Sequence, residues 1–169
     1  MPRPGTQVLR GPLMKITFAL AAMPMLLFAS TARAGDNAVE APILQFIAAF
    51  NHGDLKAAKA AHVASPSIAD EVAPYHWNGP RAFDSWVADL TRSETVEGKT
   101  DGQVTMLPVT RELVSGGHAY VTVPSTYTFK QHGKTMHEVS QMTYILARGK
   151  AGWKIESWTW TGPEASPVK

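Results

Sequence analysis

A short extended segment places a carboxylate and a histidine beside two large aromatic side chains. Asp70 is followed by Tyr75, His76 and Trp77. A carboxylate enclosed by aromatic side chains loses water, so its pKa rises, and a histidine titrates near neutral pH without any shift. Asp70 or His76 could therefore act as a general base. The candidate hydroxyls for polarising a substrate carbonyl belong to Tyr120 and Tyr127.

The same residues also allow a purely structural interpretation. Asp70 could lie in a solvated acidic turn, with the neighbouring tyrosine and tryptophan packed on the core, as many globular surfaces provide.

Several signatures of known chemistry do not occur. The chain has no cysteine, which excludes disulfides, a thiolate zinc site and a cysteine nucleophile. It also has no nucleophile elbow, phosphate-binding glycine loop or dinucleotide fingerprint. His137 and Glu138 begin like a zinc motif, but Gln141 stands where the second histidine is required. Because His76, His118 and His137 lack ligand spacing, we expect neither a metal nor a cofactor.

Helical patterns come first along the chain. Asp54 is placed to cap a second helix that runs to about His62, and Gly79-Pro80 opens a third. Residues 67–78 are expected to be extended, and the polar residues 91–102 are expected to form a loop. The first helix is predicted by apolar residues at helical spacing, namely Val39, Ile43, Phe46, Ile47 and Phe50.

Strand patterns occupy the rest of the chain. Four runs separated by short turns predict an antiparallel meander: 103–114, 118–130, 135–147 and 153–161. Helices followed by strands indicate an α+β fold, with the N-terminal helices packed on the concave face of a curved, cone-shaped sheet. Such a sheet leaves a mostly apolar pocket lined by alternate strand residues, which suits a small ligand.

The alternation does not decide which sheet face lines the pocket. His118 and Tyr120 share one face of their strand, and Gln141 and Thr143 share one face of the next. These polar residues could line the pocket or be partly solvated. The candidate ligand-binding residues are Tyr75, Trp77, Trp86, His118, Gln141 and Thr143.

The last strand carries two tryptophans on its charged side. Strict alternation places Trp158 and Trp160 with Lys154 and Glu156, opposite Ile155. Aromatic residues on such a face favour a homodimer interface. The alternative is a platform on which a sugar or steroid stacks.

The N-terminal 34 residues have the pattern of a signal peptide. Lys15 precedes an apolar run, and Ala32-Arg33-Ala34 matches a cleavage site before Gly35. The apolar run is short for a membrane span, although an uncleaved anchor is the alternative. We expect Met14 to be the true start and residues 35–169 to form one periplasmic or secreted domain, free of the membrane after cleavage.

Removing this leader changes the sign of the net charge. It holds four of the 16 basic residues and no acidic one, which leaves 12 basic against 14 acidic residues. The expected mature chain is therefore slightly acidic, so nucleic acid is not an expected partner.

Several local phrases resemble the nuclear transport factor 2-like superfamily, in particular its SnoaL-like and ketosteroid-isomerase-like group. These phrases are FIAAFNHGD, WNGPRAFDSW, AYVTVPSTYTFKQHGK and GWKIESWTW, and the resemblance covers roughly residues 38–162. It implies an α+β cone with a deep pocket, commonly a dimer through the sheet. Members range from isomerases, dehydratases and cyclases to domains without known activity. Catalytic members use an Asp or His in the pocket, and the candidates here are Asp70, His76 and His118.

Three functions remain open at this point. The first is an exported domain that binds a small hydrophobic or aromatic molecule, with no catalysis demonstrated by its residues. The second is a cofactor-independent acid–base isomerase, lyase or cyclase that acts next to a carbonyl. The third is a dimeric protein-interaction module. A base paired with a tyrosine hydroxyl inside the pocket would favour the enzyme, and a pocket without that pair would favour the binder.

Overall fold

The computed structural model describes residues 34–168, so the expected signal peptide lies outside the described residues except for Ala34. Three helices and eight strands make up this part of the chain. The helices are α1 (Ala34–Asn51), α2 (Leu55–Ala60) and α3 (Ala82–Glu97). The strands are β1 (His62–Ala69), β2 (His76–Asn78), β3 (Lys99–Met106), β4 (Arg111–Ser115), β5 (His118–Gln131), β6 (Lys134–Gly149), β7 (Gly152–Thr161) and β8 (Ser166–Pro167).

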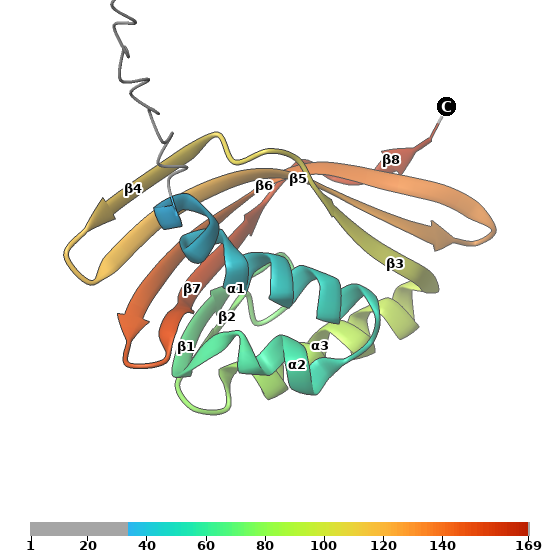
Figure 1. The fold of residues 1–169 in the computed structure, drawn as a ribbon. Coiled ribbons are helices and arrows are strands. Elements are labelled where there is room, and N and C mark those ends of the chain that lie inside the picture. The colour runs from blue at the N-terminus through green and yellow to red at the C-terminus, as the bar shows by residue number, and fades with distance from the viewer. Residues whose placement is uncertain (1–33, 169) are drawn as a thin grey trace, which may run out of the picture. The chain divides into compact units, whose positions relative to one another are not determined.

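The strands form one curved sheet, and the helices lie on its concave face (Figure 1). The strand order is β2-β1-β7-β6-β5-β3, with β4 paired to β5 and β8 paired to β6. The long strands β5, β6 and β7 are the predicted antiparallel meander. The expected α+β fold with a curved sheet and N-terminal helices is therefore confirmed. None of the described helices is long and apolar enough to span a membrane.

The core lies between α1, α3 and the sheet. Val39, Ile43, Phe46 and Ile47 are buried, as their helical spacing predicts. Phe46 contacts the ring of Trp158 on β7, with centroids 5.6 Å apart, and lies at the centre of a cluster of aromatic rings. The rings around it belong to Phe50, His62, Phe83 and Trp86. This packing fixes the helices against the sheet at the base of the concave face.

Helix α3 is longer than the sequence pattern indicates. Its last turns occupy residues that we expected to form a loop, and it ends at Gly98, whose φ of 65° is the left-handed conformation of a helix C-cap. The apolar stripe ends at Leu90, and Ser93, Glu94 and Glu97 continue the same face. The hydrophobic periodicity disappears there because this face lines a cavity instead of the core.

Two further boundaries differ from the expectation. Helix α2 ends at Ala60, and His62 begins β1, which pairs in parallel with β7. A parallel partner so distant in sequence has no local signal, because no short turn joins the two strands. The expected strand 103–114 is divided into β3 and β4, which both pair with β5.

An irregularity in β7 reverses the expected alternation of its side chains. Leu146 pairs with Ile155, whereas Ile145 pairs with Ser157, so Glu156 is an extra residue on β7. After this bulge, Trp158 lies on the same concave face as Ile155. The sequence predicted these two residues on opposite faces, which is wrong for this reason.

Candidate functional site

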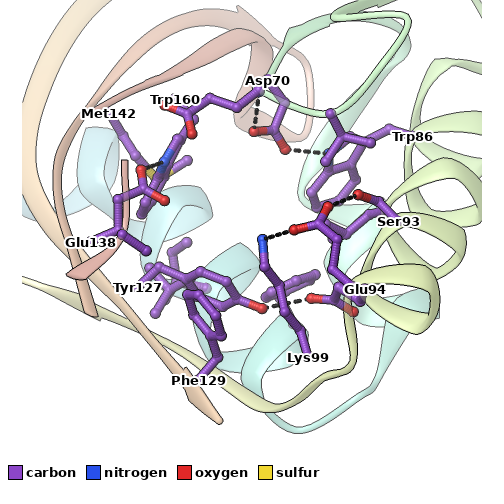
Figure 2. Close-up of a pocket in the computed structure, with 18 of the residues that line it drawn as sticks. Asp70, Trp86, Ser93, Glu94, Lys99, Tyr127, Phe129, Glu138, Met142 and Trp160 are labelled. Atoms are coloured by element: carbon purple, nitrogen blue, oxygen red, sulfur yellow. Dashed lines mark hydrogen bonds and ion pairs between the residues drawn. The ribbon is translucent and has the colours of Figure 1, made fainter. Parts of the chain in front are cut away.

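A cavity of about 480 Å³ opens between α1, α3 and the concave face of the sheet (Figure 2). Its volume lies within the range of about 300–1,000 Å³ that is typical of sites for small organic molecules. The aromatic side chains of its walls are Phe46, Phe50, Trp86, Tyr127, Phe129, Trp158 and Trp160.

Carboxyl groups also line the cavity, which is therefore more acidic than the mostly apolar pocket that we expected. They belong to Asp70, Glu71, Glu94, Glu97, Glu138 and Glu164. Lys99 is the cation among the described lining residues. Asp70, Glu94 and Glu138 approach the cavity from different sides, from the end of β1, from α3 and from β6 (Figure 2).

Asp70 directly follows β1 and is held by two donors. Its Oδ2 accepts a hydrogen bond of 2.6 Å from the indole Nε1 of Trp86, and its Oδ1 accepts one of 2.7 Å from the backbone N–H of Glu71. Burial raises the pKa of the Asp70 carboxyl above its ordinary value, and the charge of Glu138 adds to the rise, whereas the bond from Trp86 opposes it. A carboxyl of this kind can exchange a proton nearer to neutral pH than an exposed one.

Glu138 is a buried carboxylate on β6, only 8% exposed. Its Oε1 accepts hydrogen bonds from the hydroxyl of Ser140, at 2.7 Å, and from the indole of Trp160. Gly162 leaves room for this group, since a Cβ at that position would lie 2.6 Å from Oε1. The pairing explains why the sheet tolerates a glutamate on its concave face.

The hydroxyl of Tyr127 is already engaged inside the cavity. It donates a hydrogen bond of 2.6 Å to Oε1 of Glu94. Burial, and then Glu94, raise the pKa of the Tyr127 hydroxyl above its ordinary value. Because its proton points to Glu94, Tyr127 does not offer this proton to a substrate carbonyl. The base and hydroxyl pair that would favour an enzyme is therefore not assembled in this geometry.

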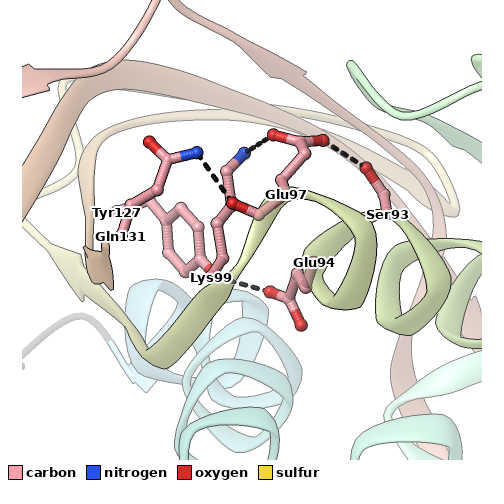
Figure 3. Close-up of polar contacts among 6 residues, drawn as sticks. All are labelled: Ser93, Glu94, Glu97, Lys99, Tyr127 and Gln131. Carbon is pink, nitrogen blue, oxygen red and sulfur yellow. Dashed lines mark hydrogen bonds and ion pairs between the residues drawn. The ribbon is translucent and has the colours of Figure 1, made fainter. Parts of the chain in front are cut away.

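Lys99 is paired with a glutamate of α3 near the same wall (Figure 3). Its Nζ lies 2.7 Å from Oε2 of Glu97 and 4.9 Å from the centroid of the Phe129 ring. The bond from Lys99 lowers the pKa of Glu97, and a bond from Ser93 adds to this effect. The charge of Lys99 is therefore largely balanced locally by Glu97.

Some of the residues chosen from the sequence reach the cavity and others do not. Asp70, Tyr127 and Trp86 line it. The two tryptophans that we expected at a dimer interface, Trp158 and Trp160, line it as well, and Trp158 is 2% exposed. Trp158 is therefore a core residue and not an exposed interface residue.

The remaining candidates lie away from the cavity lining. His76 is exposed, with its Nε2 3.0 Å from the hydroxyl of Ser67, and Tyr75 is 63% exposed. Trp77 is buried and donates to Asp89. His118 lies at the start of β5, and its Nε2 is 3.7 Å from Oε2 of Glu156. Tyr120, Gln141 and Thr143 lie on the outer face, because the buried residues of β5 and β6 alternate with them.

Four charged side chains that line the cavity were not among the residues chosen from the sequence. Glu94, Glu97 and Lys99 fall in the segment that we expected to be a loop, and Glu138 was noted only as part of an incomplete zinc motif. The helical spacing from Leu90 to Ser93, Glu94 and Glu97 was the signal that could have found two of them. Within residues 34–168 no group of His, Asp and Glu side chains is arranged to hold a metal ion.

Solved structures of low sequence identity share this fold. A hexachlorocyclohexane dehydrochlorinase from Novosphingobium barchaimii aligns with a TM-score of 0.68 at 11% identity, covering 80% of this chain and 90% of that one. An NTF2-like protein with a cystatin-like fold from Novosphingobium aromaticivorans aligns with a TM-score of 0.62 at 17% identity, covering 78% of this chain and 83% of that one. A ketosteroid isomerase-like protein from Erwinia carotovora atroseptica aligns with a TM-score of 0.58 at 18% identity, covering 75% of this chain and 95% of that one.

The sequence itself was compared with curated proteins and with protein families. The curated proteins gave no match. The family comparison matched residues 39–160 to the SnoaL-like domain, which agrees with the resemblance seen in the sequence. This match spans most of the chain, which therefore belongs to the SnoaL-like domain family.

Proposed function

We propose that this domain binds a small organic molecule in the cavity between α1, α3 and the sheet. The cavity of about 480 Å³ with aromatic walls is the observation that supports this function. The partly exposed rings of Phe50, Tyr127 and Trp160 provide apolar contact area, and the carboxyl groups provide fixed acceptors that orient a ligand. A ligand with an aromatic or other apolar body fits these walls.

A screen of small aromatic molecules tests this function. Binding inside the cavity changes the emission of its tryptophans, and it also raises the melting temperature through mass action. A Leu90→Trp variant fills part of the cavity and should abolish binding. A Leu44→Trp variant, at an exposed position of α1, is the matched control and should bind normally. Equal binding by both variants would place the ligand elsewhere.

Acid–base catalysis is the second candidate function, and Asp70 favours it. Asp70 lines the cavity and its pKa is raised by burial, so its carboxyl could take a proton from a bound substrate and return it. The hydroxyl of Tyr127 supports this function less, because it donates to Glu94. The NTF2-like fold serves both binding proteins and isomerases or dehydratases, so the fold does not choose between the two functions.

Turnover separates the catalyst from the binder. If a ligand from the screen is converted, Asp70→Asn should lower kcat by about 100-fold or more while the ligand still binds. His76→Ala, at an exposed position outside the cavity, is the control and should leave kcat unchanged. Unchanged kcat in Asp70→Asn would exclude Asp70 as the base.

A further inference from the structure

The cavity has more negative than positive groups. Its lining includes six carboxyl groups and, among the described residues, one lysine. Nζ of that lysine lies 2.7 Å from Oε2 of Glu97, which is its ion-pair partner. Burial raises the pKa of Asp70 and of Glu71, and the charge of the lysine opposes this rise only as the smallest contribution. Asp70, Glu94 and Glu138 receive their hydrogen bonds from indole, hydroxyl or backbone N–H groups, which carry no net charge.

The hydrogen bonding of Glu138 indicates most directly which kind of ligand the cavity suits. Only 8% of the residue is exposed, and both of its hydrogen bonds end on the same oxygen, Oε1. No described residue donates to Oε2. This oxygen is not fully enclosed by the protein. Since Glu138 lines the cavity, Oε2 is left open to its contents. A buried carboxylate oxygen without a donor favours a charged donor from the ligand.

The walls beside these carboxylates are faces and edges of aromatic rings. Each of the three carboxylates accepts a hydrogen bond from an aromatic side chain that also lines the cavity. The donors are Trp160 for Glu138, Trp86 for Asp70 and Tyr127 for Glu94. Aromatic faces attract cations and disfavour anions. Carboxylates and aromatic walls therefore select the same kind of ligand.

We propose that the ligand of this cavity is an organic cation, a protonated amine attached to an aromatic or other apolar body. The proposal rests on the binding function proposed above and specifies the chemical class of its ligand. The apolar body lies against the partly exposed rings of Phe50, Tyr127 and Trp160, and the ammonium group donates to Oε2 of Glu138, within the field of Glu94 and Asp70. An anionic ligand would meet these three carboxylates, and among the described lining residues the one cation, Lys99, is already paired with Glu97.

Two sets of probes with matched shapes test the charge preference. One set is tryptamine, tryptophol and indole-3-acetate, and the other is 2-phenylethylamine, 2-phenylethanol and phenylacetate. Titration calorimetry at low ionic strength measures each dissociation constant. We expect the amine to bind about ten-fold or more tightly than the alcohol, and the acid to bind most weakly.

A charge-neutral variant locates the effect. Glu138→Gln keeps an oxygen that can accept hydrogen bonds from Trp160 and Ser140 but removes the charge. It should weaken binding of the amine about ten-fold and binding of the alcohol by less than about two-fold. Glu94→Gln is the second variant, in case the first does not fold. Glu156→Gln is the matched control, since this glutamate pairs with His118 outside the cavity, and it should change neither affinity.

The outcomes separate this inference from the proposed function. If the alcohol binds as tightly as the amine, or if Glu138→Gln weakens the binding of both equally, the proposal of a cationic ligand is overturned. The proposed binding function of the cavity would still stand. Tightest binding of the acid would overturn the cationic ligand as well. If no probe of either set binds, the cation is overturned, and the screen with Leu90→Trp and Leu44→Trp still decides the binding function.

Discussion

His62 is a buried imidazole whose two nitrogens have different partners. The indole of Trp158 donates to Nε2 at 3.1 Å, so Nε2 carries no proton, and Nδ1 donates to the carbonyl of Ala58 at 3.0 Å. The ring is therefore a neutral tautomer with both nitrogens satisfied. Burial lowers its pKa to about 4 in the folded protein.

This protonation state predicts a loss of stability in mild acid. Above pH 6.5 the ring is neutral in both states, but below it the unfolded chain takes up a proton that the folded chain refuses until about pH 4. The free energy of unfolding should fall between these values by at most about 3 kcal/mol. Urea denaturation at several pH values measures it.

The contribution of His62 is isolated by a variant, because the raised pKa values of Asp70 and Glu71 act in the opposite direction. His62→Gln should be less stable at pH 7 but lose less stability on acidification. His52→Gln, at an exposed position, should follow the parent chain. Parallel pH curves for His62→Gln and the parent would contradict the assignment.

The side chain of Tyr127 lies so close to Gly102 that we expect only glycine to fit at this position. A Cβ at this position would lie 2.3 Å from the Tyr127 hydroxyl oxygen and 2.9 Å from its ring carbons. The ring stacks on Phe129 and donates to Glu94, so it cannot move away freely. Gly102→Ala should lower the free energy of unfolding by about 1–3 kcal/mol. Gly117→Ala, which meets nothing within 4 Å, should change it by less than about 0.5 kcal/mol. Thermal denaturation of both variants checks this pair.

At the scale of elements, the sequence predicts well where one face of an element is apolar. The spacing of Val39, Ile43 and Phe46 placed α1, and the alternation of β5 and β6 placed both strands. The prediction failed where an element faces the cavity or carries an extra residue. The last turns of α3 show a polar stripe because they face the cavity, and the bulge at Glu156 shifts the alternation in β7.

The candidate site was harder to predict than the fold for the same physical reason. Asp70, Tyr127 and Trp86 were found because their residue types suggested chemistry. Glu94 and Glu138 looked like solvated residues, since a glutamate in a helix or strand most often faces water. Only the packing of distant elements brings these two carboxylates to one cavity.

The short helix α2 allows a test of a local prediction that held. Asp54 is its N-cap, and its side chain accepts a hydrogen bond of 2.9 Å from the backbone N–H of Ala57. Asp54→Ala should lower the free energy of unfolding by about 0.5–2 kcal/mol, because one N–H of the first turn loses its partner. Asp54→Ser keeps an acceptor and should retain most of the stability in the same denaturation experiment. Equal losses in both variants would show that the cap is not responsible.

At the scale of the whole molecule, the homodimer stays a prediction. Leu113 on β4, Tyr120 on β5 and Ile145 on β6 lie side by side in register on the outer face, where Leu113 is 51% exposed. We expect this row to lie in the interface, so light scattering after size exclusion should give a dimer mass, and Tyr120→Lys should give a monomer. Leu44→Lys, at an exposed position of α1, should remain a dimer. A monomer for the parent chain would contradict this interface.

Export likewise stays a prediction from the first 34 residues. Expression of the full chain in a bacterial host should yield a periplasmic or secreted protein that begins at Gly35, as N-terminal sequencing can check. Ala34→Asp should block the cleavage, since the small residue before the cut is required. A mature protein that still carries the leader would contradict the predicted site.

The parallel pairing of β1 with β7 affects when the chain can fold. The hydrogen bond between Trp158 and His62 joins residues 96 positions apart, so β1 lacks its parallel neighbour until almost the whole chain has been synthesised. Contacts of such long sequence separation slow folding. A chain that stays unfolded for longer would be compatible with the export that its N-terminal pattern predicts.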